Sequence, residues 1–149
     1  MGRGDPEESI LEVGPLRLDM DPILLALSAL LLAAAVAAAL AKRFILDNSD
    51  FWMAMGLILA DRKRYDKAAR CCERAVRIYP FYVHAWNNWG LSLYQLGRYE
   101  EALERLDEAL TLNPDLGEGW HNRGLVLEKL DRKEEAEEAF ARADRLGVG

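Results

Sequence analysis

The chain has 149 residues, which allows one modest domain together with a short accessory segment. Its formal net charge of −6, and the absence of any pattern of interleaved basic and aromatic residues, argue against a nucleic-acid partner. The sequence holds no glycine-rich phosphate loop, no HExxH motif and no nucleophile elbow, so neither an enzymatic activity nor a cofactor is predicted.

The first part of the chain joins an acidic segment to an apolar one. Residues 1–21 carry two arginines against six carboxylates, and we expect a flexible acidic tail there. Residues 22–41 carry no charge, and Ser28 is their only polar residue. A helix needs about 20 apolar residues to cross the hydrocarbon core of a bilayer, so this run predicts a single transmembrane helix.

Two alternatives compete with a transmembrane helix. A cleaved signal peptide is one, although such a peptide has a positively charged leading segment and a shorter apolar core. A helix buried as a cap on the following domain is the other. If the run is a span, Lys42 and Arg43 follow it directly, within a predicted juxtamembrane linker over 42–48. Because basic residues beside a span stay in the cytoplasm, we expect a cell-membrane protein with its N-terminus outside and residues 49–149 in the cytoplasm.

Residues 49–149 contain an internal repeat with a period of 34 residues. Three tryptophans mark it, Trp52, Trp86 and Trp120, and each is followed at fixed distances by a glycine, a leucine and two alanines. The spacing of three and four within each unit predicts two amphipathic helices per unit. The matching columns are Gly56, Gly90 and Gly124; Leu59, Leu93 and Leu127; Ala68, Ala102 and Ala136; and Ala75, Ala109 and Ala143.

This pattern resembles the tetratricopeptide repeat (TPR), a helix–turn–helix unit of 34 residues. The resemblance covers residues 49–82, 83–116 and 117–149 without a gap. It implies an all-α solenoid, because a repeat of this kind buries its apolar faces only by stacking on its neighbours. In the second repeat, the second helix is expected over Tyr99–Leu112.

The third repeat departs from the second on its outer helix. Leu103 and Leu110 of the second repeat are replaced by Glu137 and Asp144. Those columns would pack against a following repeat, so the charges predict that the last helix caps the solenoid.

Two further features of the first repeat concern its second helix. Cys71 and Cys72 are neighbours on a helix and poorly placed to bridge, so we expect free thiols, with Cys72 buried and no metal site. Four basic residues share one helical stripe. This stripe attracts anionic lipid, pairs with the acidic second helix of repeat two, or is simply solvated. The stripe consists of Lys67, Arg70, Arg74 and Arg77.

In the TPR family, the first helices of the repeats line the concave side and hold ligands. Transferred to this sequence, the resemblance implies a groove for a partner protein or peptide. Its predicted residues are Met53, Leu57, Asn87, Asn88, Leu91, Tyr94, His121, Asn122 and Leu125.

Individual groove positions have two interpretations. Asn88 and Asn122 either hold the backbone of an extended peptide or serve packing. One branch of the family clamps a terminal carboxylate with Lys and Asn in its first repeat, where this chain has Met53 and Leu57. The resemblance therefore implies a ligand with apolar anchors, a short amphipathic helix or an extended strip. Alternatively, Met53 and Leu57 pack against residues 44–46.

Together these features favour a membrane-anchored adaptor or scaffold that binds a partner protein. The alternative is a self-associating structural component of a membrane assembly. Ala29, Ala33, Ala37 and Ala41 share one face of the predicted span, and small residues in such a row allow two helices to pack closely. Nine alanines in 20 positions also produce such a row by composition alone.

Overall fold

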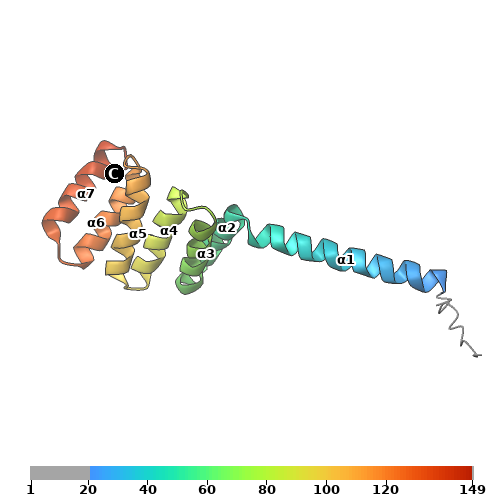
Figure 1. Cartoon of the computed structure of the whole chain (residues 1–149). Coiled ribbons are helices and arrows are strands. Elements are labelled where there is room, and N and C mark those ends of the chain that lie inside the picture. The colour runs from blue at the N-terminus through green and yellow to red at the C-terminus, as the bar shows by residue number, and fades with distance from the viewer. Residues whose placement is uncertain (1–20, 149) are drawn as a thin grey trace, which may run out of the picture. The chain divides into compact units, whose positions relative to one another are not determined.

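The computed structural model describes residues 21–148, in which seven helices and no strand are found (Figure 1). Apart from Asp21, the predicted acidic tail lies outside the described residues. The chain divides into two units, Met1–Ala39 and Leu40–Gly149. The prediction of an all-α solenoid after a long apolar helix is confirmed.

Helix α1 runs over Pro22–Leu46. It starts at a proline, whose missing amide proton is no loss in the first turn, and the Asp21 carboxylate accepts a hydrogen bond from the Ile23 amide at 2.9 Å. By length and composition, α1 can cross a membrane, and none of its residues is buried. The helix continues through residues 42–46, which the sequence assigned to a linker.

The second unit contains three helix pairs, which follow one another along the chain (Figure 1). Within each pair the two helices pack together, and the second helix of one pair packs on the first helix of the next. This is the stacking that the repeat pattern predicts. The pairs are α2 (Ser49–Asp61) with α3 (Tyr65–Ile78), α4 (Val83–Gln95) with α5 (Tyr99–Leu112), and α6 (Gly117–Lys129) with α7 (Lys133–Arg145).

The turn inside each pair needs one residue in the left-handed region. These residues are Lys63, Gly97 and Asp131, with φ of 57°, 74° and 58°, and they are spaced by the repeat period. Glycine adopts this conformation without a steric penalty, whereas lysine and aspartate do so less readily. Repeat two therefore has the least strained turn.

The core follows the sequence columns. Alanines at the helix crossings, such as Ala68 and Ala102, are fully buried, and they allow the paired helices to approach closely. The largest fully buried side chains include Leu93, Leu106 and Leu127. Two of these three belong to repeat two, which has a neighbouring pair on each side.

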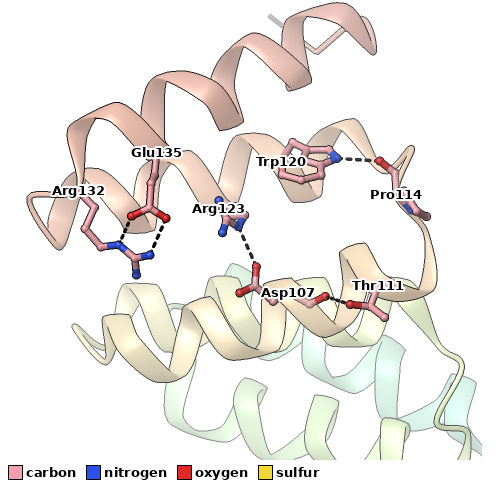
Figure 2. A network of polar contacts seen from close by, with 7 residues as sticks. All are labelled: Asp107, Thr111, Pro114, Trp120, Arg123, Arg132 and Glu135. Atoms are coloured by element: carbon pink, nitrogen blue, oxygen red, sulfur yellow. Dashed lines mark hydrogen bonds and ion pairs between the residues drawn. The ribbon is translucent and has the colours of Figure 1, made fainter.

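The repeated tryptophans tie each pair to the chain that precedes it. The indole N–H of Trp52 donates to the Leu46 carbonyl at 2.9 Å. Trp86 and Trp120 make the equivalent bond at 2.7 Å, each to the carbonyl of the proline six residues earlier. Figure 2 shows the bond of Trp120 to Pro114. The tryptophan column thus fixes the connection before each pair as well as filling the core.

Candidate functional site

A hollow of about 220 Å³ lies between the first helices of repeats one and two. Its volume is below the about 300–1,000 Å³ of typical small-molecule pockets, so it suits one side chain of a larger ligand. It is lined by Ala60, Tyr65, Asn88, Leu91, Ser92 and Gln95. Asn88 and Leu91, two of the predicted groove residues, are therefore brought together here.

The two asparagines of the groove column make equivalent contacts. The side-chain amide of Asn122 donates to Asn87 Oδ1 at 3.1 Å, and that of Asn88 points at Met53 Sδ at 4.0 Å. Both contacts connect the first helix of one repeat to the first helix of the repeat before it. These contacts support the packing interpretation of this column. The Oδ1 atom of Asn88 takes no part in the contact with Met53.

Met53 and Leu57 differ in burial although they lie one helical turn apart. Met53 is 7% exposed and belongs to a cluster with Ala75, Val76 and Ala85, whereas Leu57 is 50% exposed. Phe44 belongs to residues 44–46, the alternative packing partner of Met53 and Leu57, and it is 74% exposed. Met53 thus belongs to the core, and Leu57 presents apolar surface.

The remaining predicted groove residues are all at least partly covered. Asn87 is buried, while Tyr94, Leu125 and His121 are half-buried. The Tyr94 ring packs on Tyr99, and the His121 imidazole lies 5.5 Å from the centre of the Phe140 ring. Of the nine predicted groove residues, Leu57 is exposed, Met53 and Asn87 are buried, and the other six are half-buried.

Tyr65 lines the hollow but was absent from the predicted groove. It is the first residue of α3, directly after the turn of repeat one. The family pattern draws attention to the first helices only, so this second-helix residue was passed over. Its aromatic ring directly after a turn was the signal that could have revealed it.

One charged contact joins α6 to α5, and further polar contacts lie within α5 and at the start of α7. Arg123 Nε donates to an Asp107 carboxylate oxygen at 2.8 Å, and Thr111 donates to the Asp107 carbonyl (Figure 2). At the start of α7, Arg132 forms two hydrogen bonds with Glu135, at 2.7 and 2.6 Å. That contact lowers the pKa of the Glu135 carboxyl below its ordinary value. Asp107, Thr111 and Arg123 also line a hollow of about 300 Å³, together with Leu110 and Trp120.

Both cysteines are free and Cys72 is buried, as predicted; Cys71, whose burial was not predicted, is buried as well. Burial, with a smaller contribution from the adjacent Cys71, raises the pKa of Cys72 to about 12. Burial also raises the pKa of Cys71. Because the thiolate is the reactive form, the raised pKa values lower the reactivity of both side chains at neutral pH.

Structures of known proteins match the repeats. A crystal structure of MamA superposes with a TM-score of 0.65 at 19% identity, over 68% of this chain and 60% of that chain. MamA MSR-1 C2 gives 0.62 at 27% identity, over 68% and 58%. The first TPR of Spaghetti (RPAP3), bound to the HSP90 peptide SRMEEVD, gives 0.66 at 20% identity, over 68% and 80%.

The match spans less than two thirds of the length of either MamA structure. No curated protein matches the sequence. Tetratricopeptide repeat models match residues 49–82 and 117–146, and a TPR repeat model matches residues 90–131. With its repeat period, its three stacked helix pairs and these matches, the chain belongs to the tetratricopeptide repeat family.

Proposed function

We propose that the chain is a membrane-anchored adaptor that binds a segment of a partner protein along the first helices of its repeats, at the cytoplasmic face. The observation that carries this proposal is the hollow between repeats one and two, and Leu57 adds exposed apolar surface to the first helix of repeat one. A protein-interaction scaffold is also the role to which the TPR fold and its peptide-binding neighbour point. No catalytic role is assigned.

The chemistry of the surface defines the ligand. Leu57 and Leu91 offer apolar contact, while Asn88 Oδ1 and the Gln95 amide offer hydrogen bonds to a peptide backbone. The RPAP3 repeat is bound to the HSP90 peptide SRMEEVD. Where one branch of the family clamps a terminal carboxylate with Lys and Asn, this chain has Met53 and Leu57. We therefore expect a segment with an apolar anchor residue and no requirement for a free C-terminus.

The membrane part of the proposal rests on α1. Its uncharged run matches the length that a bilayer requires, and Lys42 with Arg43 sets the direction by the positive-inside rule. Protease added to sealed vesicles of known sidedness tests this part. Cleavage within residues 49–149 only from the cytoplasmic side is expected, whereas full solubility of the chain would overturn the anchor.

The groove is tested by crosslinking the full chain in its native membrane and identifying what is captured. A Leu57→Glu, Leu91→Glu variant places charge on the apolar contact surface, and Ala141→Glu places the same charge at an exposed position of α7. The adaptor proposal expects a captured protein that the double variant loses and the Ala141→Glu variant keeps. Asn122→Ala is unsuitable, because it also breaks the contact with Asn87.

The self-associating alternative predicts a different outcome of the same experiment. Only the chain itself would be captured, and the groove variants would not change the yield. Replacing Ala33 and Ala37 by leucine would then abolish dimers in detergent, because the larger side chains keep two spans apart.

A further inference from the structure

Repeat one carries a surface that the other repeats lack. The connection from α3 to α4 exposes Tyr79 and Phe81, whose side chains are 50% and 66% exposed and whose ring centres lie 6.1 Å apart. The equivalent residues between α5 and α6 are Asn113 and Asp115. An exposed aromatic pair thus replaces two polar residues at the same place in the fold.

In the sequence, the basic stripe of α3 directly precedes this aromatic pair. All four of its side chains are exposed, and the only ion pair that they form with another described residue joins Arg77 to Glu73 on α3 itself. The Arg74 guanidinium lies 4.6 Å from the centre of the Trp52 ring. The predicted pairing of the stripe with the acidic residues of α5 is therefore not found among the described residues.

The turn before α3 extends the positive charge. Arg62, Lys63 and Arg64 are all exposed, while the acidic residues of this repeat, Asp66 and Glu73 among them, are fewer than the basic ones. Repeat one thus combines exposed aromatic rings with exposed cations, of which only Arg77 forms an ion pair with a described residue. Cations attract the anionic headgroups of the cytoplasmic leaflet, and aromatic residues favour the interface between headgroups and acyl chains.

We propose that α3, with Tyr79 and Phe81, forms a docking surface for the anionic surface of the bilayer. The proposal rests on the membrane anchor of the proposed function, because the anchor keeps this surface at high local concentration near lipid. Phe81 and Tyr79 enter the interface, while the stripe contacts phosphate groups. Repeat one then lies on the membrane, and the more acidic repeats two and three extend into the cytoplasm.

The test reconstitutes the full chain in nanodiscs of phosphatidylcholine, with or without phosphatidylserine. A spin label is attached at Phe81→Cys, and a matched label at Asp115→Cys reports the equivalent connection between repeats two and three. The native thiols are buried, so the unmodified chain should take up no label and serves as the blank. Because Phe81 is largely exposed, its replacement leaves the core intact.

The readout is the accessibility of each label to oxygen relative to a water-soluble nickel complex. With phosphatidylserine, we expect this ratio to be several-fold higher at 81 than at 115, and a Lys67→Glu, Arg70→Glu variant should remove most of the difference. Equal ratios at the two positions would overturn the proposal and leave an acidic protein as the partner of the stripe. Comigration of the chain with the nanodiscs tests the membrane anchor separately, so failure of the anchor can be distinguished from failure of the docking surface.

A second measurement avoids the label. Amide hydrogen exchange of residues 79–83 in the native sequence should slow when phosphatidylserine is present, and a Phe81→Asp variant should not show this protection. Unchanged exchange in both lipid compositions would contradict the proposal even if the labelled variant behaved as expected.

Discussion

Helices α5 and α7 occupy the same place in their repeats, but they present different outer faces. Leu103 and Leu110 of α5 are 9% and 6% exposed, because α6 packs on them. The equivalent Glu137 and Asp144 of α7 are exposed, and among the described helices α7 packs only on α6. The difference shows that this second-helix column is apolar in repeat two, where α6 covers it, and charged in repeat three, where no described helix does.

Among the first helices, repeat one is the repeat with the more exposed face. Ser92 of α4 and Val126 of α6 are buried against the preceding pair, at 4% and 0% exposure. The equivalent Ile58 of α2 is 50% exposed. Repeat one therefore keeps an apolar residue on a face that the other repeats cover, whereas repeat three has charges on its uncovered face.

The largest effect should come from exchanging residues between α5 and α7. The variant with Leu103→Glu and Leu110→Asp puts two carboxylates where α6 packs, and we expect the free energy of unfolding to fall by at least about 3 kcal/mol. Urea unfolding of the full chain in detergent micelles, followed by circular dichroism, measures this.

The reverse exchange is the control. Glu137→Leu with Asp144→Leu changes an exposed face, so the stability should change by no more than about 0.5 kcal/mol, while self-association increases. A large loss of stability in this variant would mean that α7 has partners that the comparison with α5 misses.

The glycine column should give the next largest effect, and it should differ between repeats. A Cβ at Gly90 would lie 2.6 Å from Leu106 Cγ and 3.1 Å from the Ala102 carbonyl oxygen, whereas at Gly56 the nearest atom is Cys72 Sγ at 3.2 Å. Gly90→Ala should therefore destabilise by about 1–3 kcal/mol through overpacking. Gly56→Ala should change stability by no more than about 1 kcal/mol, because the helix propensity of alanine offsets a mild contact. Equal losses in parallel thermal melts would contradict this ranking.

Removing one indole hydrogen bond should have a smaller effect. Trp120→Phe deletes the donor to the Pro114 carbonyl, and a bond of this kind contributes about 1 kcal/mol to stability. Trp89→Phe removes a similar area from a ring whose N–H has no bonded partner among the described residues. The difference between the two variants in denaturation midpoint isolates the bond, and no difference would show that the tryptophan column acts through packing alone.

The smallest expected effect is a loss of stability in acid. Hydrogen bonding to Arg132 lowers the pKa of Glu135, so the pair stabilises the fold above the ordinary carboxyl pKa of about 4.3 and the contribution disappears as the pH falls through the lowered value. Arg132→Gln should thus reduce stability near neutral pH and match the native chain in strong acid. Arg64→Gln, at the equivalent position of repeat one, should show no such pH dependence, because Lys67 stands where Glu135 does.

Sequence periodicity predicted the helices, whereas it left the exposure of the individual groove residues open. The bounds of α5 were predictable because turn residues, apolar columns and the proline all recur at one spacing. The sequence could not predict that Met53 is buried while Leu57 is exposed, because both residues are apolar and only the packed structure distinguishes their faces. Tyr79 and Phe81 lie outside the repeat columns, so the pattern assigned them no role.

The bond from Trp52 to the Leu46 carbonyl has a mechanical consequence. Leu46 ends α1, and its carbonyl accepts the same kind of bond that Pro80 and Pro114 accept farther along the chain. The joint between α1 and repeat one is therefore made like the joints between repeats. A pull on residues 40–46 would load this hydrogen bond as well as the covalent chain, so tension on α1 would reach α2 directly.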